Sequence, residues 1–228
     1  MKGPVLSVWA PNAKCVAAII GEVEQPMVSG VGGWWETSAP VQHGSTYQFL
    51  IDGQGPFPDP RSASQPKGIM GPSKLVDHAA FAWNDCCWRP PPFGSAVIYE
   101  LHIGTFTPAG TFDSAIERLS YLVELGVTHL ELMPVAEFAG NRGWGYDGVE
   151  LFAPHQAYGG HRGLKRLVNA CHQKGLAVLL DVVYNHLGPA GNFLEKFGPY
   201  FTKGSTTQWG EAVNLSGEWS DDVRQFFS

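Results

Sequence analysis

Residues 175–186 read GLAVLLDVVYNH, and the other segments can be interpreted around them. A glycine precedes the uncharged run 176–180, which predicts a strand buried on both faces, as in a parallel sheet. Asp181, Asn185 and His186 close the stretch. In barrels of alternating strands and helices, catalytic residues follow the carboxyl ends of strands. Since burying three polar groups requires a reason, we expect these three at a functional site.

Two strands and two helices are predicted before this stretch. The strands are expected at 96–101 and 127–133, and the second helix at 161–174. The first helix has apolar residues at helical spacing up to Leu125, and Asp113 is its predicted N-cap. Strand, helix, strand, helix, strand indicates parallel βαβ units.

The amino-terminal part has a different pattern, which predicts an all-β domain. Alternating apolar runs bounded by turn residues occur at Val5–Trp9, Cys15–Ile20 and Thr46–Ile51. Asp52-Gly53 is a hairpin signal, and short strands at this spacing favour a small β-sandwich. Residues 54–73 are expected to be an ordered connector.

The proline run Pro90-Pro91-Pro92 predicts a domain boundary, which divides the chain into residues 1–92 and 93–228. Residues 187–218 lack periodicity and are expected to form a long functional loop, followed by a helix from Ser220.

Composition excludes several classes of partner. The 228 residues carry a net charge of -6, which argues against nucleic acid because phosphate binding needs clustered Lys and Arg. The sequence shows no basic run for a membrane surface, no apolar stretch of spanning length and no leader, so we expect a cytoplasmic protein without a membrane or nucleic-acid partner. The four cysteines lack zinc spacing and are expected to be reduced thiols.

A second candidate segment, Gly143-Trp-Gly-Tyr-Asp-Gly148, follows the second strand. Its glycines allow unusual backbone conformations and close approach of a ligand. Tyr146 suits stacking on a sugar ring, whereas Trp144 either stacks on sugar or plugs the top of a barrel. His102, after the first strand, is either a site residue or a structural one, and Glu131 is expected to be a polar group of the barrel interior.

Aromatic residues also occur within 187–218. They either line a cleft or only pack the loop: Phe193, Tyr200, Phe201 and Trp209. The sequence contains no dinucleotide, phosphate-loop, zinc-protease or serine-hydrolase motif.

These motifs together resemble the α-amylase superfamily of glycoside hydrolases. DVVYNH (181–186) is similar to its first conserved region, at the end of barrel strand three. Longer segments, at 99–119, 128–160 and 182–202, resemble the trehalose-releasing members. The resemblance implies a multidomain fold, an immunoglobulin-like β-sandwich followed by the first three βα units of a (β/α)8 TIM barrel, with the barrel incomplete.

The resemblance also implies an activity and a set of substrate-binding residues. The parent enzyme would release trehalose from maltooligosyl trehalose, or act on a related α-glucan, by cleaving the adjacent α-1,4 bond. Tyr146 would stack on the sugar, His186 would hydrogen-bond its hydroxyls, Asp181 would support the site from below, and Asn185 would hold the following loop. Trp144 and His102 complete the expected set, and no cofactor or metal is expected.

Retaining glycosidases need two carboxyl groups about 5–5.5 Å apart. In this superfamily the nucleophile and the acid/base follow strands four and five. We therefore expect both to lie beyond Ser228, so that the sequence is truncated before them, contains no catalytic residue and is inactive alone.

Two alternatives stay open at this point. A glucan branching enzyme shares the layout but transfers the glucan to another chain; the segment HIGTFTPAGTF argues against it. A non-catalytic glucan-binding module is the other. Against it, Trp34 and Trp35 are adjacent, so on a strand they point to opposite faces and cannot form one platform.

Overall fold

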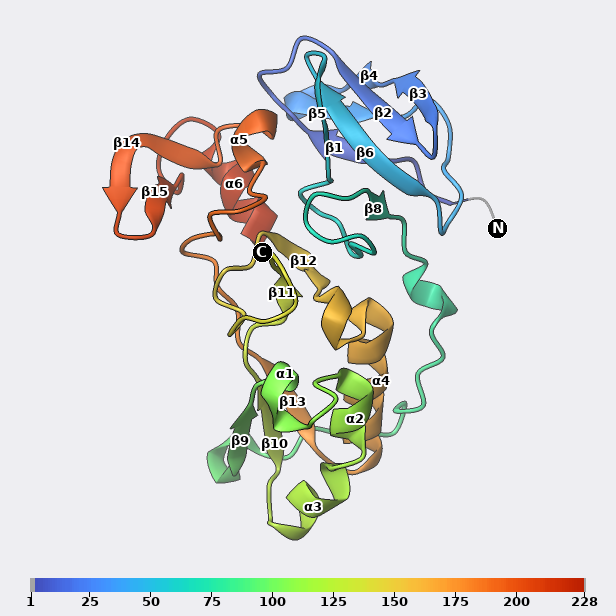
Figure 1. Ribbon diagram of the computed structural model, residues 1–228, viewed down its shortest axis with the longest axis vertical. Coiled ribbons are helices and arrows are strands. Elements are labelled where there is room, and N and C mark those ends of the chain that lie inside the picture. The colour runs from blue at the N-terminus through green and yellow to red at the C-terminus, as the bar shows by residue number, and fades with distance from the viewer. Residues whose placement is uncertain (1–2, 228) are drawn as a thin grey trace.

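The computed structural model describes residues 3–227, and its amino-terminal part is built from two antiparallel sheets (Figure 1). One sheet has the order β1 (Ser7–Trp9), β5 (Trp34–Glu36), β4 (Val28–Ser29). The other has the order β3 (Val23–Pro26), β2 (Val16–Ile20), β6 (Thr46–Ile51), β7 (Gln54–Phe57), and β8 (Ser73–Lys74) also pairs with β6. The segment expected to be only a connector therefore begins and ends in strands.

Both sheets contribute to one hydrophobic core. Val8 and Trp35 from the first sheet lie in the same buried cluster as Phe49 from the second. The cluster extends to Phe197 and Val223 of the carboxyl-terminal part, so the two halves of the chain pack against each other. The immunoglobulin-like topology and the division at residue 92 remain predictions.

Trp34 and Trp35 both pack against this core. Trp35 is buried and its indole N–H donates to the carbonyl of Ala10 at 3.1 Å, while Trp34 is half-buried. Neither ring is free to form a broad sugar platform.

The second part contains a parallel sheet of β9 (Ile98–Leu101), β10 (His129–Leu132) and β13 (Ala177–Leu180), with β10 in the middle. The helices α2 (Phe112–Ile116) and α3 (Leu119–Glu124) connect β9 to β10, and α4 (Gly160–Gln173) precedes β13. A second core of buried residues, mostly aliphatic, lies between this sheet and these helices.

The prediction that the 176–180 strand is buried on both faces is wrong. Val178 and Leu179 are only half-buried and Leu180 is 48% exposed, and within residues 3–227 β13 is an edge strand that pairs with β10 alone. An apolar run shows that a strand has buried neighbours, but it does not show on how many sides.

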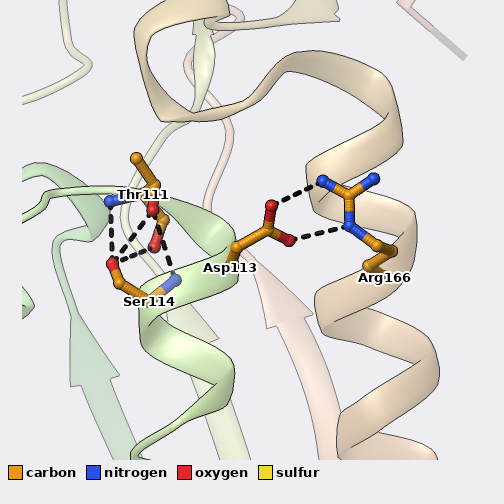
Figure 2. Close-up of polar contacts among 4 residues, drawn as sticks. All are labelled: Thr111, Asp113, Ser114 and Arg166. Carbon is orange, nitrogen blue, oxygen red and sulfur yellow. Dashed lines mark hydrogen bonds and ion pairs between the residues drawn. The ribbon is translucent and has the colours of Figure 1, made fainter.

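The prediction of a single helix capped by Asp113 is also wrong. The N-cap of α2 is Thr111, whose side chain accepts a hydrogen bond from the Ser114 N–H, and the Ser114 hydroxyl oxygen accepts one from the Thr111 N–H (Figure 2). This reciprocal arrangement is a capping box. Asp113 lies in the first turn instead and pairs with Arg166 of α4 at 2.7 Å.

The expectation of a structureless segment at 187–218 is corrected by a short helix and a hairpin. These are α5 (Leu194–Phe197), β14 (Phe201–Thr207) and β15 (Gly210–Val213). The predicted last helix is confirmed as α6 (Ser220–Phe227), and its Phe226 is buried.

Ser228, the last residue of the printed sequence, lies outside the described residues. The expectations that rest on it, namely that the nucleophile and the acid/base lie beyond Ser228 and that the chain is inactive alone, therefore stay predictions. The same holds for the assignment of residues 93–228 to the start of a catalytic domain, which the structure describes only as far as Phe227.

The remaining elements are short. They are α1 (Ile103–Phe106), β11 (Ala136–Glu137), β12 (Glu150–Pro154), and the 3₁₀ turns η1 (Val31–Gly33), η2 (His78–Ala80), η3 (Phe93–Ser95) and η4 (Gln156–Tyr158). None of the helices found in the described part of the chain is both long and apolar enough to cross a membrane.

Candidate functional site

The candidate residues emerge from one edge of the parallel sheet. Leu101, Leu132 and Leu180 are the last residues of β9, β10 and β13, and they pair across the sheet in register. The chain segments that follow the three strands therefore start side by side. His102 follows β9 and Asp181 follows β13, so the register explains why residues far apart in sequence meet here.

Tyr146 and Asp181 are in direct contact. The phenol of Tyr146 donates a hydrogen bond to Oδ2 of Asp181 at 3.2 Å. Partial burial, followed by the Asp181 carboxylate, raises the pKa of Tyr146, so the phenol keeps its proton and acts as a donor. The side chain of Tyr146 is 41% exposed, which leaves part of the ring open to a ligand.

His186 is held by the same loop. Its Nε2 lies 3.0 Å from the carbonyl oxygen of Tyr146, which assigns this nitrogen as the hydrogen-bond donor. Asp181 and His186 are half-buried, while Asn185 is exposed. The expectation of three buried polar groups is therefore wrong: the segment after β13 runs along the surface, and Asn185 faces solvent.

The glycines of the 143–148 loop fix its path. Gly145 has φ +92°, and a Cβ there would lie 2.0 Å from the carbonyl oxygen of Pro134. Gly188 approaches from the other side, where a Cβ would lie 2.1 Å from the carbonyl oxygen of Asp147. Larger residues at either position would displace the loop that carries Tyr146.

Trp144 does not plug the sheet, so the interpretation as a plug is wrong. Its side chain is 63% exposed, and its ring lies 5.1 Å from the His102 ring at an interplanar angle of 57°. A cavity of about 470 Å³ opens beside it, lined by Thr105, Arg142 and Tyr158 among others. Trp144 therefore presents an aromatic surface to solvent.

His102 holds the loop from below. Its Nε2 lies 2.8 Å from the Gly143 carbonyl oxygen and 3.0 Å from the Tyr158 hydroxyl, and its Nδ1 lies 3.1 Å from the Thr105 hydroxyl. Both ring nitrogens are engaged within the protein and the side chain is buried. This geometry fits a residue that positions Trp144.

Glu131, on β10, is half-buried and pairs in register with Glu100 of β9. Both carboxylates lie close enough to add to the rise in the pKa of Tyr146, after the effects of burial and Asp181. Glu100 and Glu131 are therefore further acidic groups near Tyr146.

The sequence did not single out Trp209 among the loop aromatics, but the structure does. Trp209 stands at the turn between β14 and β15, is 60% exposed and stacks on His186 with ring centroids 5.4 Å apart and planes at 21°. Tyr200, by contrast, is buried against Trp9, and Phe193 and Phe201 pack on the core. The only local feature of the sequence at this point is the pair Trp209-Gly210, which follows the threonine-containing stretch 202–207.

We searched the described residues for clusters of side chains that could bind a metal ion. Across residues 3–227 the structure has no group of three or more His, Cys, Asp or Glu side chains arranged around a common point for a metal ion. The site consists of exposed aromatic rings beside hydrogen-bonding groups, which suits a neutral, hydroxyl-rich ligand.

The chain was compared with protein families, curated proteins and solved structures. The family described as "Alpha amylase, catalytic domain" matches residues 57–208. The chain therefore belongs to the α-amylase family.

Individual members of this family are similar to the chain over most of its length. The chain is 51% identical over 224 residues to a malto-oligosyltrehalose trehalohydrolase from Arthrobacter ramosus, a match that covers 96% of this chain and 39% of the relative. It is 30% identical over 254 residues to the 1,4-alpha-glucan branching enzyme GlgB of Pseudoalteromonas atlantica, covering 96% of this chain and 34% of that enzyme. The chain thus corresponds to the amino-terminal part of its trehalohydrolase relatives and spans about 39% of their length.

Solved structures share the arrangement. A candidate alpha amylase from Salmonella typhimurium superimposes with a TM-score of 0.91 at 40% identity, over 98% of this chain and 39% of that protein. A pullulanase from Anoxybacillus sp. LM18-11, complexed with maltotetraose, gives a TM-score of 0.81 at 25% identity, over 98% of this chain and 40% of its own.

Proposed function

We propose that this chain is the sugar-binding, amino-terminal part of a glycoside hydrolase that releases trehalose from maltooligosyl trehalose. In this proposal β9, β10 and β13 are the first three strands of a (β/α)8 barrel. Residues 1–92 form an immunoglobulin-like module, and residues 93–228 begin the catalytic domain.

The observation that carries the proposal is the contact between Tyr146 and Asp181 beside His186. Asp181 accepts from the Tyr146 hydroxyl at 3.2 Å and His186 donates to the Tyr146 backbone carbonyl at 3.0 Å, so the tip of the side chain and its backbone are both held while the residue stays 41% exposed. An aromatic face fixed in this way can stack on a sugar without losing much side-chain entropy on binding. The half-buried Asp181 offers a carboxylate oxygen for hydroxyl groups, while His186 supports the loop through its Nε2 and its Nδ1 is buried.

Trp144, beside the His102 ring, and Trp209, stacked on the His186 ring, add further exposed aromatic surface. Asn185, on the exposed part of the same segment, borders it. His102 takes part indirectly, because it fixes the loop that carries Trp144. The proposal gives these residues a binding role and assigns hydrolysis to a pair of carboxyl groups that the superfamily resemblance places after two later strands.

The decisive experiment supplies maltooligosyl trehalose to the protein that carries this sequence and separates the products by anion-exchange chromatography. We expect free trehalose. Formation of longer or branched glucans without free trehalose would assign the protein to the branching-enzyme alternative instead.

Tyr146→Ala tests the binding role. The loss of stacking and of the hydrogen bond to Asp181 should lower kcat/KM about tenfold, which corresponds to about 1.4 kcal/mol of transition-state stabilisation. Tyr121→Ala is the matched control, because Tyr121 is 60% exposed on α3, away from this edge, and should leave kcat/KM unchanged. Equal kinetics for both variants would refute the role of Tyr146.

Native electrophoresis of the 228-residue chain in a starch-containing gel tests binding without catalysis. We expect retardation that Tyr146→Ala reduces. Retardation that is the same for the variant would place glucan binding elsewhere and favour the module alternative.

A further inference from the structure

Two adjacent cysteines lie in the segment that leads into the parallel sheet. Cys86 and Cys87 are both exposed and free, and their sulfur atoms are 3.7 Å apart. They occupy the two central positions of a turn that is closed by a hydrogen bond from the Trp88 N–H to the Asp85 carbonyl oxygen at 2.9 Å. The turn thus presents both thiols to solvent at one point.

The turn is fixed to the carboxyl-terminal end of α4. The carboxylate of Asp85 lies 2.6 Å from Nδ1 of His172, and the ring of Trp88 stacks on the His172 ring at 3.8 Å and 12°. One residue earlier, the Asn84 N–H donates to the side-chain oxygen of Asn169 at 2.8 Å. These contacts hold both ends of the turn and therefore fix the backbone that carries the two cysteines side by side.

This place is opposite the candidate sugar site. The chain leaves α4 at Gln173 and enters β13 at Ala177, so His172 lies near the amino ends of the strands. Tyr146 and Asp181 lie at the carboxyl ends. Figure 1 shows the connecting segment passing along α4 toward the strands, away from the 136–154 region.

The geometry selects the kind of group that can bridge the sulfurs. Adjacent Cα atoms are 3.8 Å apart, shorter than the 4.4–6.8 Å usual between disulfide-bonded cysteines, so a direct S–S bond is strained. A third atom between the sulfurs relieves that strain. Linear two-coordinate mercury would place the sulfurs on opposite sides of the metal, whereas pyramidal trivalent arsenic binds two sulfurs on the same side.

We propose that Cys86 and Cys87 form a binding site for trivalent arsenicals. The other two thiols are unsuited, because Cys15 stands alone and Cys171 is fully buried. Burial raises the pKa of Cys171 to about 12, which suppresses the reactive thiolate further.

The reaction is a condensation with no change of oxidation state. An arsenoxide R–As=O gains two As–S bonds, one to each cysteine, and loses its bonds to oxygen. The two thiol protons leave with that oxygen as one molecule of water. Arsenic stays trivalent and the sulfurs stay at the thiol level, so no oxidant is needed.

Phenylarsine oxide is the probe, and intact-mass spectrometry of the whole 228-residue chain is the readout. We expect one phenylarsenic adduct per chain, which resists excess glutathione and is removed by a dithiol. Cys86→Ser or Cys87→Ser leaves a single sulfur, and the loss of chelation should weaken the apparent affinity by about 10²- to 10⁴-fold. Cys15→Ser is the matched control at an exposed cysteine and should keep the adduct.

A second measurement uses the unaltered chain. Iodoacetamide should label Cys86 and Cys87 in the native protein, and prior phenylarsine oxide should block both while Cys15 stays reactive. Absence of the adduct, equal removal by glutathione and dithiol, or an adduct retained by Cys86→Ser would each overturn the proposal.

Discussion

Glu150, the first residue of β12, has a buried carboxyl group that is not fully hydrogen-bonded. It is 4% exposed, and its Oε2 has no hydrogen-bond partner. Burial and then the neighbouring Asp59 carboxyl raise the pKa of Glu150 well above its usual range, and a hydrogen bond from Gln65 opposes them only in part. Asp59 is itself buried, and burial also raises its pKa despite the hydrogen bond from Tyr47 at 2.7 Å. Folding therefore raises the pKa of both carboxyl groups, Glu150 above all.

The sign of the pH dependence follows from this shift. A carboxyl group whose pKa is higher in the folded state than in the unfolded one makes its full contribution to stability below the unfolded pKa, about 4.3 for Glu. As pH rises from that value through the folded pKa of Glu150, the unfolded state releases a proton that the folded state must keep. Each such proton lowers the free energy of unfolding by up to about 1.4 kcal/mol per pH unit.

Glu150→Gln replaces the protonated carboxyl by a neutral group of similar shape. Near pH 4 the variant should match the wild type within about 1 kcal/mol, since both side chains are then neutral. Above that pH the variant should become the more stable protein, and the difference should grow by up to about 1.4 kcal/mol per pH unit until the folded pKa is passed.

Urea denaturation at pH values from 4 to 9 measures this difference. Glu24→Gln is the control, because it makes the same substitution at a residue that is exposed on β3. If Glu150→Gln destabilises the protein equally at every pH, the buried group is a charged and satisfied one, and the reasoning is refuted. Since Asp59 interacts with Glu150, the titration steps belong to the pair rather than to one residue.

Two further predictions concern the contacts of Figure 2. Thr111→Ala removes the oxygen that accepts from the Ser114 N–H at 3.2 Å and should cost about 1 kcal/mol in urea denaturation; no change would show that water replaces the cap. Arg166→Ala removes the bidentate ion pair with Asp113. Because the side chains of Arg166 and Asp113 are 46% and 57% exposed, the substitution should lower the free energy of unfolding by less than about 1 kcal/mol. That cost should shrink as salt is added, and a cost that salt leaves unchanged would assign it to lost packing of the arginine stem.

The helix before the 176–180 strand shows what the sequence can predict. The spacing predicts 161–174 and the structure has α4 at Gly160–Gln173, because apolar residues at helical spacing are buried along one face and Gly175, with φ +78°, follows its end. The β14–β15 hairpin was missed for the converse reason. Most of β14 is exposed, so no alternation of apolar and polar residues marks it.

The start of α2 was misassigned because two residues compete for the cap. Asp113 is a good capping residue, but Thr111 and Ser114 at spacing i, i+3 satisfy each other's backbone N–H groups, which one aspartate cannot do. The edge position of β13 was beyond the sequence because hydrophobicity does not report strand order. The position of Trp209 over His186 likewise depends on a hairpin that local pattern does not reveal.

The order of the strands explains why the predicted site residues come together. Tyr146 lies in the loop that follows the central strand, so the segments after both outer strands can reach its loop. His102, after β9, fixes Gly143 at 2.8 Å, and Asp181, after β13, fixes the Tyr146 phenol at 3.2 Å. Because the loop is held on both sides, a substitution in either neighbouring segment should move the aromatic ring even when the loop itself is unchanged. In the proposed sugar site the DVVYNH segment would therefore act in two ways: it would supply the Asp181 carboxylate, and it would set the position of Tyr146.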